Sequence, residues 1–184
     1  MRGKREQRQL KLIEEFVSVV ETAGAGCWLR GGWALDFLLG RVTRAHEDLD
    51  LFIWAADAPK LLPILERHGF EEVGGPPPAM QRNLVKGGEE LHVTLLERNE
   101  IGVVTASGRR ADAPWPGAML DGPIGRVGHI RCRVISPEAQ LYAKTKHPHA
   151  LSRAPREQDQ VDIALLRHVL ADQARRQSNP QVSQ

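Results

Sequence analysis

Residues 27–54 read CWLRGGWALDFLLGRVTRAHEDLDLFIW, and this stretch decides the fold. The apolar run Cys27–Leu29 is typical of a strand, the pair Gly31 and Gly32 of a turn, and the apolar spacing that follows of a short helix ended by Gly40. Backbone N–H groups at such a junction can approach an anion closely, and the helix dipole favours phosphate there. We therefore expect Gly31 and Gly32 to bind phosphate.

The same stretch ends with a pair of carboxylates, Asp48 and Asp50, beside the apolar run Leu51–Trp54. Residues two apart in a strand point to the same face and lie roughly 7 Å from each other. Carboxylate oxygens are the ligands that Mg²⁺ prefers, and an ion held there can also bind phosphate oxygens. An isolated pair of this kind is more often a solvated strand start, but the glycine junction favours a phosphate site.

Several positions of this stretch together match a known pattern. They are Gly31–Asp36, Gly40–Arg44, His46 and Asp48–Leu51, with weaker similarity over 91–105 and 136–141. The pattern resembles the nucleotidyltransferase superfamily with a polymerase-beta-type palm, and within it the aminoglycoside and lincosamide antibiotic nucleotidyltransferases. The resemblance implies an α+β fold, in which a mixed β-sheet palm with flanking helices carries a small, mainly helical C-terminal lobe.

The resemblance also implies a reaction. An NMP would pass from an NTP, expected to be ATP, to a hydroxyl group of a small aminoglycoside- or lincosamide-like molecule, with Mg²⁺ as cofactor, expected as two ions. The implied partners are the NTP and the acceptor, without nucleic acid or membrane. Nucleotidylation of a protein or of tRNA, and nucleotide binding without catalysis, are the alternatives. The implied site residues are Asp48, Asp50 and His92 for catalysis, Asp48 and Asp50 for metal, and Gly31, Gly32, Arg44, His46 and Lys144 for the nucleotide.

His92 is the position at which the chain departs from that family. The family carries a third carboxylate on a later strand, and the equivalent position here is His92, in the run Glu89–Thr94. His92 can act as the base for the acceptor hydroxyl, with Glu90 two residues away on the same strand face. Three other interpretations stay open. In the first, the alignment of His92 with the third carboxylate is shifted. In the second, the metal site is incomplete and catalysis is lost, and in the third, the acceptor differs from the antibiotics.

Other charged residues have two interpretations each. Arg44 and His46 either contact phosphate or brace the turn before the carboxylates. Lys144 either reaches the triphosphate from the C-terminal lobe or is an ordinary exposed lysine. Asp159 and Asp162, three apart on the last expected helix, are either solvated or salt-bridged to the palm.

The composition fits one compact unit. With 184 residues and 41% hydrophobic content, the chain can bury one core, or a core with a small lobe. Its formal net charge of +2 does not require a nucleic-acid partner. Cys27 and Cys132 form no CxxC pattern, so neither a disulfide framework nor a zinc site is indicated, and no apolar run reaches membrane-spanning length. We expect a cytoplasmic protein.

Turn signals and hydrophobic periodicity divide the chain into segments. These are a palm domain at 1–106, a loop-rich connection at 107–128, a C-terminal strand and helical lobe at 129–176, and a frayed tail at 177–184. Helices are expected at 6–23, 33–39, 58–68, from 137 onward, and 157–174. Strands are expected near 27–29, 48–54, 70–73, 81–85, 90–96, 102–105 and 129–135.

Two further expectations concern the surfaces of these elements. The last helix should bury an apolar face made of Val161, Ile163–Leu165 and Val169. A cationic acceptor such as an aminoglycoside would favour an acidic cleft, to which the chain can contribute Glu71, Glu72, Glu89 and Glu90.

Overall fold

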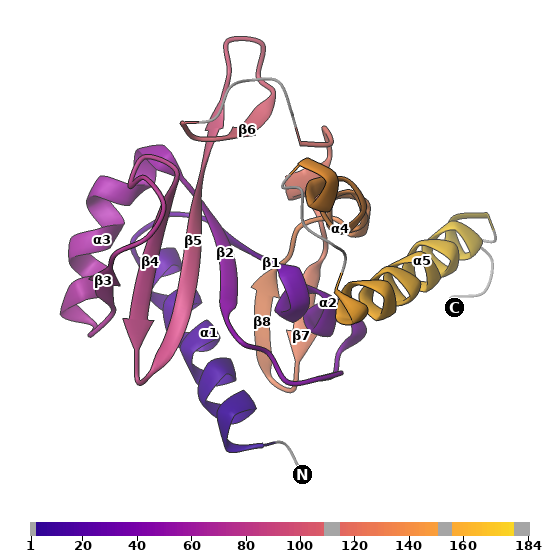
Figure 1. The fold of residues 1–184 in the computed structure, drawn as a ribbon, viewed down its shortest axis with the longest axis horizontal. Helices are drawn as coiled ribbons and strands as arrows, with labels where there is room; N and C mark the ends of the chain where they lie inside the picture. Colours follow the sequence, from indigo (N-terminus) through magenta and orange to yellow (C-terminus); the bar gives the residue numbers. More distant parts are fainter. Residues whose placement is uncertain (1–2, 109–114, 151–155, 179–184) are drawn as a thin grey trace.

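The computed structural model describes residues 3–108, 115–150 and 156–178 (Figure 1). Positions 179–184, most of the expected frayed tail, lie outside the described residues. In chain order the elements are α1 (Lys4–Thr22), β1 (Cys27–Arg30), α2 (Gly31–Leu39), β2 (Leu49–Trp54), the 3-10 turn η1 (Ala55–Asp57), α3 (Ala58–Arg67), β3 (Glu71–Val73), β4 (Gln81–Lys86), β5 (Glu89–Arg98), β6 (Val104–Ala106), the 3-10 turn η2 (Met119–Asp121), β7 (Ile124–Val127), β8 (Ile130–Arg133), α4 (Pro137–Ala150) and α5 (Glu157–Ser178).

The main sheet is mixed. Its strand order is β1-β2-β5-β4-β3, and β6 also pairs with β5. Strands β2 and β5 run parallel, whereas the other pairs are antiparallel. Strands β7 and β8 form a separate antiparallel pair, which a parallel bridge between Leu29 and Val134 joins to β1. This mixed sheet with its flanking helices confirms the expected α+β class.

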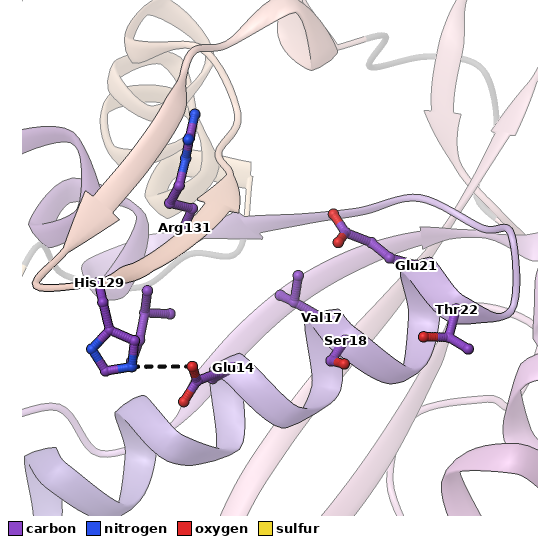
Figure 2. A pocket seen from close by; sticks show the side chains of 8 residues that line it. Glu14, Val17, Ser18, Glu21, Thr22, His129 and Arg131 are labelled. Carbon is purple, nitrogen blue, oxygen red and sulfur yellow. Dashed lines mark hydrogen bonds and ion pairs between the residues drawn. The ribbon is translucent and has the colours of Figure 1, made fainter.

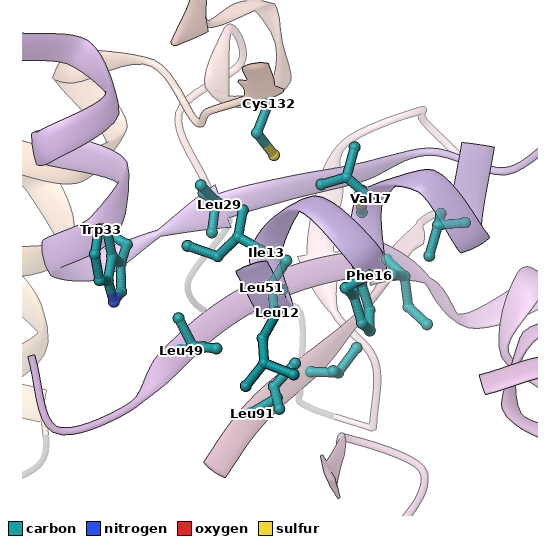
Figure 3. Close-up of a cluster of buried hydrophobic side chains, with 14 of the residues drawn as sticks. Leu12, Ile13, Phe16, Val17, Leu29, Trp33, Leu49, Leu51, Leu91 and Cys132 are labelled. Atoms are coloured by element: carbon teal, nitrogen blue, oxygen red, sulfur yellow. The ribbon is translucent and has the colours of Figure 1, made fainter. Parts of the chain in front are cut away.

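The two faces of the main sheet have different roles. Leu49 and Leu51 of β2 point into the main core, where they meet Ile13 and Phe16 of α1 (Figure 3). Because successive strand residues alternate between faces, Asp50 points to the opposite side. That side carries a smaller apolar cluster next to the polar side chains of the candidate site.

The segment from 107 to 128, expected to lack regular structure, contains strand β7. In its pair with β8, Gly125 lies opposite Cys132. A Cβ atom on Gly125 would lie 2.7 Å from the Cβ of Phe37, so the glycine lets β7 pack closely against α2. The expectation is wrong for this strand because the glycine, which suggests a turn in the sequence, serves close packing here.

Helix α5 buries a different face from the expected one. Val161 is 55% exposed and Ala164 is also exposed, so the expectation that both are buried is wrong. The buried positions are Asp159, Asp162 and Leu166, which share one face of the helix. Hydrophobic periodicity cannot find this face, because two of its three residues are carboxylates, which are rarely buried without partners.

Local signals in the sequence mark several element ends correctly. Gly40 ends α2 in the left-handed conformation with φ of 71°, and Ser136 caps α4 by accepting the N–H of Ala139 at 3.2 Å. Cys27 and Cys132 are both buried and free. Within the described ranges, no helix is both long and apolar enough to cross a membrane.

Candidate active site

Strand pairing aligns polar side chains on the sheet face opposite the main core. In the antiparallel pair β1–β2, Arg30 lies opposite Asp50, and in the parallel pair β2–β5, Asp50 lies opposite His92. Directly paired residues point to the same face and are neighbours there. Arg30, Asp50 and His92 therefore form a row across three strands, and Asp48 joins them from the position just before β2.

The imidazole of His92 faces both carboxylates. Its Nδ1 lies 3.6 Å from Asp48 Oδ2 and 3.9 Å from Asp50 Oδ1, and its Nε2 lies 3.5 Å from Glu90 Oε2. Partial burial, together with the nearby Asp50 carboxylate, raises the pKa of Asp48 above its ordinary value. A divalent cation would relieve this repulsion between two like charges.

The glycine pair begins α2 beside these side chains. Gly31 has φ of +70°, and a Cβ atom there would lie 2.7 Å from Asp50 Oδ2. A Cβ atom on Gly32 would lie 2.5 Å from His46 Nδ1 and 2.6 Å from Arg44 Nη2. No described side chain caps the N-terminus of α2, whose first N–H groups therefore remain suited to an anion. Both glycines are needed for packing as well as for any phosphate contact.

Asp36 and His46 form a buried pair behind the glycines. His46 Nε2 lies 2.6 Å from Asp36 Oδ2, and the two residues are 4% and 0% exposed. Asp36 Oδ1 accepts hydrogen bonds from the backbone N–H of Thr43 at 3.1 Å and from its hydroxyl at 2.5 Å. Trp33 packs on the imidazole, with ring centroids 4.5 Å apart. These contacts hold the turn at 41–48 in place and favour a bracing role for His46.

Arg44 connects the same turn to the C-terminal helices. Its Nη2 lies 3.0 Å from Asp162 Oδ2, and its Nη1 lies 3.1 Å from His46 Nδ1. Lys144 Nζ lies 2.7 Å from the same Asp162 oxygen and 3.1 Å from Asp159 Oδ1. Burial acts to raise the pKa of Asp162, but the hydrogen bonds from Arg44 and Lys144 outweigh it and lower that pKa. The structure thus shows the salt bridge from Asp162 to Arg44 of the palm, and Lys144 of α4 binds the same carboxylate.

Glu89 is a second buried carboxylate near the site. It is 1% exposed and accepts hydrogen bonds from Arg5 Nε at 2.9 Å, Arg8 Nη2 at 2.8 Å and Gln9 Nε2 at 2.9 Å. Burial acts to raise the pKa of Glu89, but these hydrogen bonds outweigh it and lower that pKa. The expectation that Glu89 lines an acceptor cleft is wrong, because α1 covers its carboxylate and pairs it with arginines.

The side chains that bind Glu89 also hold the main chain just before Asp48. Gln9 Nε2 donates to the carbonyl of His46 at 3.3 Å, and Arg5 Nη2 donates to the carbonyl of Glu47 at 2.6 Å. The turn that carries Asp48 is therefore held by α1 as well as by α2 and α5.

Arg30 was not predicted as part of the site or of its bracing. Glu89 was expected in the acceptor cleft and not in the bracing, and the salt bridge of Asp162 to the palm was one of two open interpretations. Arg30 ends an apolar strand directly before the glycine pair, which is a local signal. Its partner Asp50 becomes evident only once the register of β1 with β2 is known. Glu89 carries no local signal, because its partners lie on α1.

A separate shallow hollow lies between α1 and the turn joining β7 to β8. Figure 2 shows Glu14, Glu21 and Arg131 around it, with His129 Nε2 3.1 Å from Glu14 Oε1. The His129 and Glu14 side chains are 81% and 49% exposed, so solvent weakens their attraction. None of the residues predicted for the site lines this hollow.

Comparison with known families identifies the family of the chain. A family model described as aminoglycoside-2″-adenylyltransferase matches residues 12–166. The chain belongs to this family. The matched span contains the whole row of Arg30, Asp50 and His92, the neighbouring Asp48, and the bracing Asp162. The adenylyltransferase match therefore covers the site as well as most of the fold.

Individual relatives agree with the aminoglycoside-2″-adenylyltransferase family. Two 2″-aminoglycoside nucleotidyltransferases, from Klebsiella pneumoniae and Escherichia coli, are each 44% identical over 43 residues, which span 23% of this chain and 24% of the relative. The alignment thus covers only about a quarter of these relatives. ANT(2″)-Ia in complex with adenylyl-2″-tobramycin has a TM-score of 0.71 at 22% identity, covering 94% of this chain and 98% of that chain. The lincosamide adenylyltransferase LnuA, lincomycin-bound, has a TM-score of 0.69 at 22% identity, covering 86% and 96%. These structures show the shared nucleotidyltransferase fold.

The donor atoms in this adenylyltransferase-family site suit a hard divalent cation. Asp48 and Asp50 offer oxygen ligands, which Mg²⁺ prefers, whereas His92 offers nitrogen. In the described part of the chain, no three histidine, cysteine or acidic side chains are arranged to hold one ion. An ion bound by Asp48 and Asp50 would therefore take further oxygens from phosphate or water.

Acidic side chains at the rim of the site are fewer than the sequence suggested. The side chain of Glu90 is 65% exposed beside His92, and the neighbouring Glu47 is also exposed. Glu71 and Glu72 lie on β3, three strands away from β2 in the sheet order. Of the four glutamates expected in an acceptor cleft, only Glu90 is paired with a residue predicted for the site, His92.

Asp48 and Asp50 are the candidate metal ligands, and Glu89→Gln is expected to weaken Mn²⁺ binding by this pair about tenfold, because residues that orient metal ligands typically have effects of this size. The change releases the arginines that hold the turn before Asp48. Mn²⁺ affinity can be measured by electron paramagnetic resonance of the free ion. Glu15→Gln is the control, since Glu15 of α1 pairs with Lys86 of β4 and forms no hydrogen bond with the turn among the described residues. Equal Mn²⁺ affinity in wild type and Glu89→Gln would show that Glu89 only stabilises the fold.

Proposed function

We propose that this protein transfers AMP from ATP to a hydroxyl group of an aminoglycoside, releases pyrophosphate, and uses Mg²⁺ as its cofactor. The observation that carries the proposal is the position of His92 Nδ1, 3.6 Å from Asp48 and 3.9 Å from Asp50, in a chain that matches the adenylyltransferase family over residues 12–166. A cytoplasmic setting, where ATP and Mg²⁺ are both available, is part of the proposal.

The nucleotide is proposed to lie with its phosphates against the N-terminus of α2. Backbone N–H groups at Gly31 and Gly32 bind phosphate oxygens, because neither residue has a side chain to block them. When bound by Asp48 and Asp50, Mg²⁺ would neutralise phosphate charge and polarise the phosphorus under attack. Arg44, His46 and Lys144 act by bracing these groups, since each is held by a neighbouring side chain.

His92 is proposed to accept the proton of the acceptor hydroxyl. The acceptor oxygen forms a bond to the α-phosphorus, the bond from that phosphorus to the bridging oxygen breaks, and pyrophosphate leaves. The proton passes to the neutral imidazole. Three carboxylates within 4 Å then stabilise the positive ring by Coulomb attraction, namely Asp48, Asp50 and Glu90.

The acceptor is proposed to be cationic. Exposed Glu90 and Glu47 place negative charge at the rim of the site, and an aminoglycoside carries several ammonium groups that such charge attracts. A lincosamide is the second acceptor class to consider, because the structurally similar LnuA was solved with lincomycin bound. Protein, tRNA and nucleotide binding without transfer are the remaining alternatives.

Transfer can be tested with purified protein, Mg²⁺, ATP labelled at the α-phosphate, and separate acceptors. The expected result is a labelled aminoglycoside with the mass of one added AMP, and one pyrophosphate for each product molecule. Product formed only from a lincosamide would change the acceptor class. Label on protein or tRNA would support nucleotidylation of a macromolecule. Nucleotide binding without product from any acceptor would support the non-catalytic alternative.

His92→Ala is expected to lower kcat about a hundredfold while leaving the affinity for ATP nearly unchanged, because loss of a general base removes a factor of this order. Steady-state rates with a saturating acceptor and calorimetric titration with ATP would measure the two quantities. His68→Ala is a suitable control, because His68 is an exposed histidine after α3. A kcat equal to that of the control would exclude His92 as the base.

A further inference from the structure

Arg30 occupies part of the space around Asp50 in which a second metal ion would have to bind. Its Nη2 lies 3.1 Å from Asp50 Oδ1, the same oxygen that lies 3.9 Å from His92 Nδ1. The paired side chains are only 27% and 22% exposed, so their attraction is less screened than that of a surface pair. One of the two metal-binding carboxylates thus already has a cationic partner.

Neighbouring residues hold the guanidinium of Arg30 in place but leave one of its hydrogen-bond donors without an acceptor. It lies over the ring of buried Phe52, 5.0 Å from the centroid, and opposite Asp50 in the strand register. Its Nε is buried and finds no hydrogen-bond partner among the described residues. A buried donor without an acceptor is uncommon in folded proteins and often marks the place of an ion or ligand. A phosphate oxygen is the acceptor that an arginine fork binds best.

The charges of this row leave little negative charge to hold two divalent ions. Asp48, Asp50 and Glu90, which lies beside His92, contribute three negative charges, and Arg30 offsets one of them by its ion pair with Asp50, which leaves two. His92, at the position where the family resemblance implies a third carboxylate, contributes none. Two divalent ions close together repel each other strongly and need carboxylates that bridge them. The carboxylates here can compensate one ion.

We propose that this site binds one divalent cation with the nucleotide, and that Arg30 supplies through a phosphate contact the positive charge of a second ion. This refines the proposed function and rests on it, because it assumes that a nucleotide triphosphate binds beside Asp50. The proposed single ion takes the place of the two Mg²⁺ ions that the family resemblance implied. Asp48, which lies 3.6 Å from His92 and forms no ion pair with an arginine among the described residues, provides the less hindered ligand for the single ion.

The number of ions can be counted without catalysis. Wild-type protein is saturated with α,β-methylene-ATP, which cannot release pyrophosphate, and titrated with Mn²⁺ while bound ions are measured by electron paramagnetic resonance. We expect one bound Mn²⁺ per chain. The double variant Arg30→Met with His92→Asp, which removes the cation and restores a third carboxylate, is expected to bind two. Methionine retains an apolar side chain over Phe52, so the packing is largely preserved.

The phosphate contact has its own measurement. Arg30→Met alone should weaken binding of α,β-methylene-ATP roughly tenfold to a hundredfold, as expected for loss of a charged hydrogen bond, whereas Arg30→Lys should retain part of the affinity. Arg133→Met is the matched control. Arg133, on strand β8, lies with its guanidinium carbon 5.8 Å from the ring centroid of Trp28 on β1, and it forms no ion pair with Asp50 among the described residues. Unchanged affinity in Arg30→Met would overturn the role of Arg30.

The remaining outcomes separate this inference from the proposed function. Two Mn²⁺ ions in the wild type would overturn the single-ion site while leaving nucleotide transfer intact. One ion in both the wild type and the double variant would show that Arg30 and His92 do not set the number of bound Mn²⁺ ions, and this result would also overturn the inference. If neither Mn²⁺ nor the nucleotide analogue bound at all, the proposed function itself would fail.

Discussion

Asp48→Asn and Asp50→Asn are each expected to lower kcat/KM for AMP transfer by about a thousandfold or more. Each change removes one of the two oxygen ligands proposed for Mg²⁺, and a bound metal ion contributes several kcal/mol of transition-state stabilisation. The fold should survive both changes, because the two residues are partly exposed and lie at the start of β2.

The two variants should differ in stability. Asp48 is partly desolvated and close to another carboxylate, which raises its pKa, so a neutral asparagine should leave the melting temperature unchanged or raise it. Asp50→Asn removes the partner of Arg30 and should lower the melting temperature slightly. Kinetic assays and thermal unfolding would measure both effects. Asp57→Asn is the control, since Asp57 lies beyond the other end of β2. Full activity in either active-site variant would remove that residue from the metal site.

Asp162→Ala is expected to lower the free energy of unfolding by about 3 kcal/mol, the lower end of the range for breaking a buried ion pair. The Asp162 side chain is 1% exposed and binds both Arg44 and Lys144. The lower end applies because Lys144 retains Asp159, whereas Arg44 loses its carboxylate partner. Urea denaturation at neutral pH would measure the change. Asp172→Ala, on the same helix but 42% exposed, should change stability much less.

This stability difference should shrink in acid. The pKa of Asp162 is lower in the folded protein than its ordinary value, so its stabilising contribution is complete above about pH 4 and is lost as the pH falls through the folded-state pKa. Repeating the urea denaturation of wild type and Asp162→Ala at about pH 3 should therefore give a smaller gap. A gap that stays constant between the two pH values would mean that Asp162 stabilises by packing and not by charge.

Local signals explain why much of the centre of the chain could be predicted from the sequence. Helix α2 and strand β2 begin and end within about two residues of the expected positions, because glycine stops and strand alternation depend only on nearby residues. The approach of His92 to Asp48 and Asp50 depends instead on the parallel pairing of β2 with β5. Resemblance to a family supplied that pairing indirectly, and the structure shows the resulting geometry.

Charged residues that are buried by their partners were the main gap in the sequence analysis. Glu89 looks like a surface residue at the start of a strand, but the arginines that cover it lie 81 and 84 positions earlier. Asp162 likewise breaks the apolar pattern of α5, because its partners lie on α4 and in the palm. Periodicity rules assume that charge faces water, so they fail where two distant segments bring opposite charges together.

The bridge from Arg44 to Asp162 joins residues 118 positions apart, which has a consequence for the chain during its synthesis. At roughly 5–20 residues per second, Asp162 leaves the ribosome about 6 to 24 seconds after Arg44. Glu89 emerges earlier, so the support from α1 can form before the support from α5 exists. A nascent chain therefore passes through a stage in which Asp48 and Asp50, the carboxylates proposed to bind metal, follow a turn that lacks its last anchor. Ribosome pausing within that interval would prolong the stage and give chaperones and proteases more time to act on the chain.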